Sequence, residues 1–211
     1  MVESPPPRAD RSFFTRDPVT VAKRLLGQRL VRTCGDARAA GIIVETEAYL
    51  GVSDRAAHTH GGLRTDRNES MWAAGGHTYV YSIYGMHHCM NVVAGRAEEP
   101  VAVLIRALEP DEGTTKMYGR RPAARRDVDL CSGPGKLCQA LEIGRQLDGV
   151  DLVSDDRLFV ELLRQRQLPA RTIAIGPRVG VDYAGKWAAK PLRFSVLGNA
   201  HVSRPRPRAS N

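Results

Sequence analysis

Two neighbouring stretches near the start of the chain, residues 28–33 and 39–49, combine apolar and β-branched residues with polar ones and lie on either side of a short polar segment. Such stretches are typical of β-strands, and the Cys-Gly-Asp segment at 34–36 between them is typical of a tight turn. The pattern therefore predicts an antiparallel hairpin. Its second strand brings Glu45 and Glu47 to the same face, about 7 Å apart. Such a pair is either catalytic or simply solvated, and the strand alone does not decide between the two.

A second hairpin is predicted by residues 78–83 and 88–94, which are interrupted by a Tyr-Gly-Met segment at 84–86. Parity along the first strand places Tyr81 on one face and Tyr84 on the other. Tyr81 is thus positioned to line a pocket, whereas Tyr84 projects from the tip. An aromatic side chain at a hairpin tip either packs on a neighbouring element or makes a functional contact.

Helix signals occur at two places, and a third helix is expected over residues 111–121. Asp17 before Pro18 supplies an N-cap and a first-turn proline, and a Ser-Gly-Pro segment at 132–134 opens the other helix. Further strands are expected at residues 100–108, 158–163, 171–175, 178–181 and 192–196. These elements predict an α+β fold, a single mixed domain with an antiparallel β-sheet flanked by helices and a protruding β-hairpin.

The two ends of the chain differ from its interior. Residues 1–11 include three consecutive prolines and are expected to form a disordered leader, and residues 204–211 are expected to form a basic disordered tail. The interior shows no change of composition that would mark a second domain. One domain is therefore expected over residues 12–203.

The net charge of the chain is +8, from 31 Lys and Arg residues against 23 Asp and Glu residues. Residues 176–211 hold seven of the basic residues and one acidic residue. This distribution predicts a basic face or tail near the C-terminus. It favours a polyanionic partner such as a nucleic acid without identifying it.

The four cysteines form neither a C-x-x-C pair nor a zinc-finger spacing, so reduced, packed thiols and no structural metal are expected. No run of about 18 apolar residues is present, and the N-terminal region lacks the apolar core of a signal peptide. A cytoplasmic protein is therefore expected.

Three kinds of chemistry are compatible with the polar residues. A metallohydrolase could use His58, His60 and a glutamate as ligands, although an H-x-H pair with a distant acid is a common accident. A hydrolase of glycosidic bonds needs a carboxylate such as Glu47 or Glu45 to activate water. A nucleic-acid-binding module without catalysis would use basic residues and aromatic rings. Composition does not separate the last two.

Six motifs occur in order along the chain and together resemble the alkyladenine (3-methyladenine) DNA glycosylase family. They are VETEAY (44–49), AAH (56–58), YVYSIYGM (79–86), CMN (89–91), LIRALEP (104–110) and LCSGPGKLCQAL (130–141). Two further matching strings are YAGKW (183–187) and KPLRF (190–194), and the resemblance extends over about residues 13–203. It implies a single domain with a curved antiparallel sheet.

The resemblance also implies a monofunctional enzyme that hydrolyses the N-glycosidic bond of alkylated or deaminated purines without a metal or cofactor. The purines include 3-methyladenine, 7-methylguanine, hypoxanthine and ethenoadenine. The implied roles are a general base, Glu47, an arginine that helps to hold the water, Arg106, and a supporting acid, Glu45. The implied base pocket consists of Tyr49, His58, Tyr81 and Asn91.

The partner implied by the resemblance is double-stranded DNA bound by a monomer, in the cytoplasm of a bacterium or the nucleus of a eukaryote. Tyr84 would be inserted into the duplex. Further DNA contacts are expected from Met86, Arg64, Thr65 and Arg67. The sequence departs from some relatives at Leu63, where they have arginine, and at 87–88, where two histidines replace aromatic residues.

Overall fold

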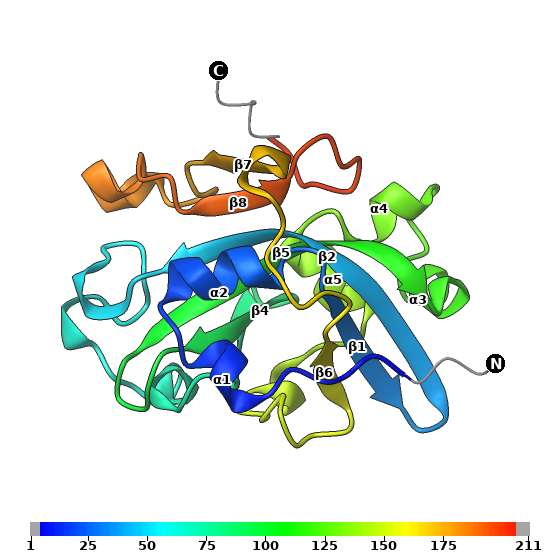
Figure 1. Cartoon of the computed structure of the whole chain (residues 1–211), viewed down its shortest axis with the longest axis horizontal. Helices are drawn as coiled ribbons and strands as arrows, with labels where there is room; N and C mark the ends of the chain where they lie inside the picture. The colour runs from blue at the N-terminus through cyan, green and yellow to red at the C-terminus, as the bar shows by residue number, and fades with distance from the viewer. Residues whose placement is uncertain (1–4, 206–211) are drawn as a thin grey trace.

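In the computed structural model, which describes residues 5–205, eight strands form one antiparallel sheet. Its central strand is β2 (Ala37–Tyr49), which pairs along one edge with β5 (Val101–Glu112). The other edge of β2 pairs first with β1 (Arg29–Cys34) and then with β8 (Arg193–Val196). Figure 1 shows β2 running across the molecule with β8 above it. The strand that carries Glu45 and Glu47 is therefore enclosed on both edges.

The sheet continues outward from this centre on both sides. β4 (His87–Ala94) pairs with β5 and forms a hairpin with β3 (Thr78–Ile83). β6 (Leu158–Glu161) pairs with β1, and β7 (Ile173–Gly176) pairs with β8. The predicted α+β class, antiparallel sheet and β-hairpin are confirmed.

Irregular pairing bends β2 close to the two glutamates. Its register against β5 shifts between Ile43 and Glu45 and again between Glu45 and Thr46. An extra residue in one strand of a pair bends that strand and increases its twist. The bulge thus curls the sheet where Glu45 and Glu47 project from it.

Five α-helices in the described range cover this sheet. α1 (Arg11–Phe14) precedes α2 (Pro18–Leu25), which Asp17 caps as predicted by accepting from the Thr20 amide. The other three are α3 (Thr114–Arg120), α4 (Asp127–Cys131) and α5 (Pro134–Ala140). Val21 and Leu25 of α2 join Ile105 of β5 and Leu137 of α5 in one buried core. This common core makes the described chain a single domain.

Three expectations about local structure are wrong. The helix expected from residue 111 begins at Thr114, because β5 extends to Glu112 and Gly113 turns the chain with φ +73°. Residues 178–181 form no strand, since Arg178 points inward to an ion pair. The leader expected over residues 1–11 is hydrogen-bonded to β6 near its C-terminal end, where the Ala9 amide donates to the Val160 carbonyl.

The long segment between β2 and β3 contains three short 3₁₀ helices, Gly51–Ser53, His60–Gly62 and Glu69–Trp72. The basic tail expected at 204–211 lies outside the described residues from position 206 onward. All four cysteines are described and free. No helix among residues 5–205 has the length and apolar character that a membrane span requires.

Candidate active site

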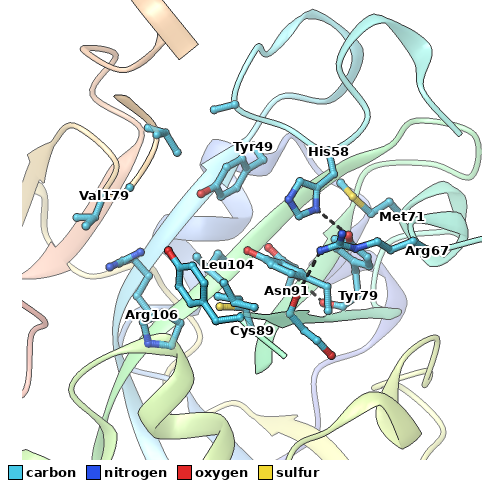
Figure 2. Close-up of a pocket in the computed structure, with 18 of the residues that line it drawn as sticks. Tyr49, His58, Arg67, Met71, Tyr79, Cys89, Asn91, Leu104, Arg106 and Val179 are labelled. Carbon is cyan, nitrogen blue, oxygen red and sulfur yellow. Dashed lines mark hydrogen bonds between the residues drawn. The ribbon is translucent and has the colours of Figure 1, made fainter. Parts of the chain in front are cut away.

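A cavity of about 350 Å³ opens between the β3–β4 hairpin, the end of β2 and the loop after β7. Figure 2 shows Tyr49 and His58 at one rim, with Arg106 and Val179 to one side and Arg67 and Met71 to the other. The four residues expected in a base pocket all line it: Tyr49, His58, Tyr81 and Asn91. The structure thus assembles residues that are up to 42 positions apart in the chain.

Aromatic rings form one wall of the cavity. The rings of Tyr79 and Tyr81 stack with centroids 5.3 Å apart, and the His58 ring meets Tyr81 edge-on at 4.6 Å. A hydrogen bond of 2.7 Å between His58 Nδ1 and the Tyr79 hydroxyl fixes the imidazole. Burial lowers the pKa of His58 below its usual value, and the nearby Arg67 charge lowers it further. His58 is therefore uncharged at neutral pH.

Glu47 lies directly behind the cavity, and its side chain is fully buried. Its carboxylate accepts hydrogen bonds from the Tyr49 hydroxyl at 3.0 Å, from Arg106 Nη1 at 3.3 Å and from the Val179 amide at 2.8 Å. All three donors belong to residues that line the cavity. Burial raises the pKa of Glu47 above its usual value, while the Arg106 charge opposes that rise. A carboxylate with a raised pKa that borders a cavity is suited to accept a proton.

Glu45 is held more tightly than Glu47. Its oxygens accept from Arg193 Nε at 2.6 Å, Arg106 Nε at 3.2 Å, the Ser203 hydroxyl at 3.0 Å and the Ser203 amide at 2.8 Å. Arg106 therefore bridges the two glutamates through different nitrogens. The prediction that both carboxylates share one face is confirmed by this shared partner.

A buried ion pair supports the other side of the cavity. Arg178 donates to both carboxylate oxygens of Asp54, at 2.5 and 2.8 Å, and both side chains are fully buried. The guanidinium also lies 4.6 Å from the ring centroid of Tyr49 and donates to the Ala48 carbonyl. Because the next residue is Val179, this pair positions the amide that contacts Glu47.

The tip of the β3–β4 hairpin is the most exposed apolar part of the site. Tyr84 is 90% exposed and Met86 is 75% exposed, and Tyr84 has a φ of +52°. Positive φ is uncommon for a residue other than glycine, and here it belongs to the turn itself. Tyr84 nevertheless borders the cavity mouth. The exposed tip expected from the sequence is confirmed.

The predicted DNA-contact residues of the long loop occupy different environments. Arg67 lines the cavity and donates to the Ser82 carbonyl at 3.3 Å. Thr65 and Leu63 line a neighbouring hollow. Arg64 instead forms surface ion pairs with Glu69 and Glu98. Because exposed ion pairs contribute little free energy, Arg64 can exchange them for another anion.

The sequence matches the family model described as methylpurine-DNA glycosylase over residues 12–200, most of its 211 residues. The chain belongs to the methylpurine-DNA glycosylase family. As a member of that family it is a DNA glycosylase, a hydrolase. The resemblance derived from the six motifs is therefore confirmed.

Similar proteins support this membership of the methylpurine-DNA glycosylase family. A protein of Bacillus cytotoxicus named "Putative 3-methyladenine DNA glycosylase" is 43% identical over 210 residues, covering 96% of this chain and all of that protein. Proteins with the same name from Bacillus cereus strain AH187 and Methanocella arvoryzae are 45% and 46% identical. They cover 93% and 95% of this chain and 99% and 98% of their own.

Several residues that shape this glycosylase-family site had not been predicted. Asp54 lies in a glycine-rich loop and Arg178 in a supposed strand, so neither pattern signals a buried ion pair. Ser203 is separated from Glu45 by 158 positions. Arg193 lies within the matching KPLRF string, which was the one available signal. These contacts depend on the tertiary fold.

Two sequence-based expectations need correction in this family member. Arg178 and Arg193 belong to the basic C-terminal stretch, yet both are buried against carboxylates, so they do not contribute to a basic face. Residues 5–205 contain no group of three or more His, Cys, Asp and Glu side chains arranged for a metal ion. The alternative with His58, His60 and a glutamate therefore has no assembled ligand set, and His60 instead contacts the Val52 carbonyl.

Proposed function

We propose that this protein removes alkylated or deaminated purines from double-stranded DNA by hydrolysing the N-glycosidic bond. The observation that carries the proposal is a buried, arginine-paired Glu47 directly behind an aromatic cavity. The names of the similar proteins support 3-methyladenine as one substrate. We assign 7-methylguanine, hypoxanthine and ethenoadenine to the same class, and residues 12–203 to the glycosylase domain.

The aromatic cavity is proposed to hold the purine after it rotates out of the duplex. Tyr49, His58 and Tyr81 line the cavity, and the His58 and Tyr81 rings meet edge-on. A purine alkylated at N3 or N7 is cationic, and cations are attracted to the faces of aromatic rings. A neutral His58 favours such a base because it adds no repelling charge. Asn91, buried beside Tyr79, would crowd the amino group of normal guanine.

Glu47 is proposed to act as the general base. In the complex with DNA, a water would take the place of the Tyr49 hydroxyl on the Glu47 carboxylate, since catalytic hydrogen bonds often rearrange when substrate binds. Glu47 would accept the proton of this water as the oxygen attacks the anomeric carbon of the sugar. Arg106 would hold both the carboxylate and the water. As the water oxygen bonds to the anomeric carbon, the C1′–N bond breaks and its electron pair stays on the departing purine. A cationic alkylpurine is neutralised by that electron pair, so one carboxylate and no separate acid are sufficient. A neutral lesion such as hypoxanthine leaves with the same electron pair and takes a proton from solvent water.

Tyr84 is proposed to fill the space that the rotated nucleotide leaves. Enzymes that rotate a base out of the stack commonly insert an apolar or aromatic side chain at that position. Tyr84 lines the cavity, and both Tyr84 and Met86 are exposed at the tip of the hairpin. Arg64, Thr65 and Arg67 are proposed to contact the DNA beside it, and a monomer is sufficient for this arrangement.

Release of free base from damaged duplex DNA tests the proposal. Glu47→Gln is expected to reduce the single-turnover excision rate at least about 100-fold, because it removes the group that accepts the proton. Its affinity for DNA carrying hypoxanthine should stay close to that of the wild type, since the aromatic cavity is unchanged.

Unaltered excision by Glu47→Gln would show that another group is the base. A wild-type protein that binds damaged DNA but releases no base would instead be the non-catalytic binding module considered from the sequence. Loss of activity with a chelator and recovery with zinc would favour the metallohydrolase alternative.

A further inference from the structure

The two glutamates belong to a cluster of four buried charges. Glu45 and Glu47 lie on β2, Arg106 on β5 and Arg193 on β8, and their side chains are at most 7% exposed. The formal charges of the four side chains cancel. Burying charges is tolerated when each has a partner, so removing an arginine of the cluster leaves a buried carboxylate without full compensation.

The partners are divided unequally between the two carboxylates. Glu45 accepts four hydrogen bonds, including the shortest arginine contact of the cluster, from Arg193 at 2.6 Å. Glu47 has one arginine contact, at 3.3 Å, to Arg106. Arg193 and Ser203 thus donate three of the four hydrogen bonds to Glu45, and Arg106 donates to both glutamates.

The contacts of the planar Arg106 guanidinium determine how Arg106 is oriented toward Glu47. Its Nε is bonded to Glu45, its Nη1 to Glu47 and its Nη2 to the Ser203 hydroxyl at 3.4 Å. Because the donors of a guanidinium are fixed in one plane, anchoring two of them sets where the third points. Arg193 also donates to the Ser203 carbonyl at 3.1 Å, which closes the cluster.

We propose that Arg193 and Ser203 are positioning residues for the base Glu47, because they compensate Glu45 and so keep Arg106 directed at Glu47. This inference rests on the proposed function of the site. Without Arg193, the Glu45 charge would draw Arg106 toward itself and would also act directly on Glu47. Either effect makes an ionised Glu47 less favourable.

The other groups facing Glu47 do not supply this balance. They are Tyr49, Tyr81, Cys89, Arg178 and the Val179 amide. Burial raises the pKa of each of the two tyrosines and of Cys89, so these groups are neutral at neutral pH. Arg178 is compensated by Asp54. Glu45 is therefore the nearby charge whose compensation depends on Arg193 and Ser203.

The test is the pH dependence of single-turnover excision from a duplex containing one hypoxanthine. The rate rises with pH as Glu47 ionises, so a less favourable ionisation moves the acidic limb to higher pH. Arg193→Gln is expected to move this limb upward by about one pH unit, and Glu45→Gln to move it downward. Ser203→Ala should move it upward by less.

Ser195→Ala is the matched control, since Ser195 is a buried β8 serine opposite Glu45 whose hydroxyl makes none of the cluster's hydrogen bonds. Its acidic limb should coincide with that of the wild type. Purely structural roles would lower rates without shifting the limb in opposite directions. Unmoved limbs, or shifts of the same sign for Arg193→Gln and Glu45→Gln, would overturn the inference.

Thermal unfolding establishes that each variant is folded before its profile is used. Should Arg193→Gln not fold, the comparison of Ser203→Ala with Ser195→Ala decides, and coinciding limbs reject the inference. A wild-type protein that releases no base would reject the proposed function itself. A wild-type protein that releases base, with a limb that no substitution moves, would reject only the positioning roles.

Discussion

At the scale of single residues, the site places an ionisable group where its charged form is unfavourable. Glu47 is fully buried and shares its arginine with Glu45. A catalytic base benefits from a pKa closer to the working pH. The folded state must then hold a buried ionised carboxylate, which lowers its stability. Stability and activity are therefore expected to oppose each other at this position.

Glu47→Gln is expected to raise the thermal unfolding midpoint at pH 7 while excision is lost. Burial raises the pKa of Glu47 in the folded state above its usual value. The folded protein thus binds the proton more tightly than the unfolded chain does. The stabilisation of the fold by proton binding to Glu47 is fully present below the pKa that Glu47 has in the unfolded chain. It is lost as pH rises through the higher pKa of the folded protein. Differential scanning calorimetry between about pH 4 and 8 measures this.

Glu45→Gln is the comparison for that experiment, because it removes a carboxylate that accepts four hydrogen bonds. It should lower the midpoint. A Glu47→Gln protein that is less stable than the wild type across the whole pH range would show that the ionised carboxylate stabilises the fold.

Asp54→Asn is expected to destabilise the protein by about 3–5 kcal/mol, because it leaves Arg178 buried with an uncompensated charge. Urea denaturation provides the measurement. The control is Asp156→Asn, whose side chain is 88% exposed and pairs with Arg8 at the surface, and which should change stability by less than about 1 kcal/mol. Similar values for the two variants would contradict the importance of burial.

At the scale of elements, the hairpin of β3 and β4 is buried where it joins the sheet and exposed at its tip. Tyr79 is buried beside His58, whereas Tyr84 is almost fully exposed. The stability of the hairpin therefore depends on its buried part. Substitutions at its tip are expected to leave the domain folded.

Tyr84→Ala is expected to weaken binding of damaged duplex about tenfold or more and to slow excision, since base–aromatic contacts are commonly worth about 1–3 kcal/mol. The unfolding midpoint should remain within a few degrees of the wild type. Fluorescence anisotropy with a hypoxanthine-containing duplex measures the affinity. Tyr84→Phe keeps the ring and should bind like the wild type. Equal affinity for the alanine and phenylalanine variants would show that the ring makes no DNA contact.

Elements with a strong local pattern were predicted well from the sequence. The β1–β2 and β3–β4 hairpins follow from strand-forming residues on either side of turn residues, and helix α2 follows from its Asp17 cap. Residues 178–181 contain two valines that suggest a strand. They form none, because Arg178 turns inward to its buried ion pair with Asp54. Helix α3 begins later than expected because pairing with β2 extends β5.

The same division holds for the site. The short-range relation between Glu45, Glu47 and Tyr49 follows from strand parity. The contacts of Ser203 and Arg193 with Glu45 span about 150 positions, and no local pattern encodes them. The aromatic wall was suggested by parity, whereas the hydrogen bond from His58 to Tyr79 depends on how the long loop folds back.

At the scale of the whole molecule, the net charge of +8 should govern how the protein finds DNA. Affinity for undamaged duplex is expected to fall at least about tenfold between 50 and 200 mM salt, as two or more phosphate contacts require. Anisotropy titrations over that range measure the slope. Glu47→Gln should show the same slope, because the buried carboxylate does not meet the phosphates. An affinity independent of salt would contradict an electrostatic contribution.

The enclosure of β2 between β5 and β8 links the site to the opening motions of the whole domain. The backbone of residues 45–47 is paired on both edges, so its amides become accessible to solvent only when the sheet itself comes apart. Amide hydrogen exchange at these positions should therefore report the free energy of global unfolding, whereas the hairpin tip at 84–86 should exchange by local opening. One exchange rate measured at Glu47 would then give the stability of the entire fold.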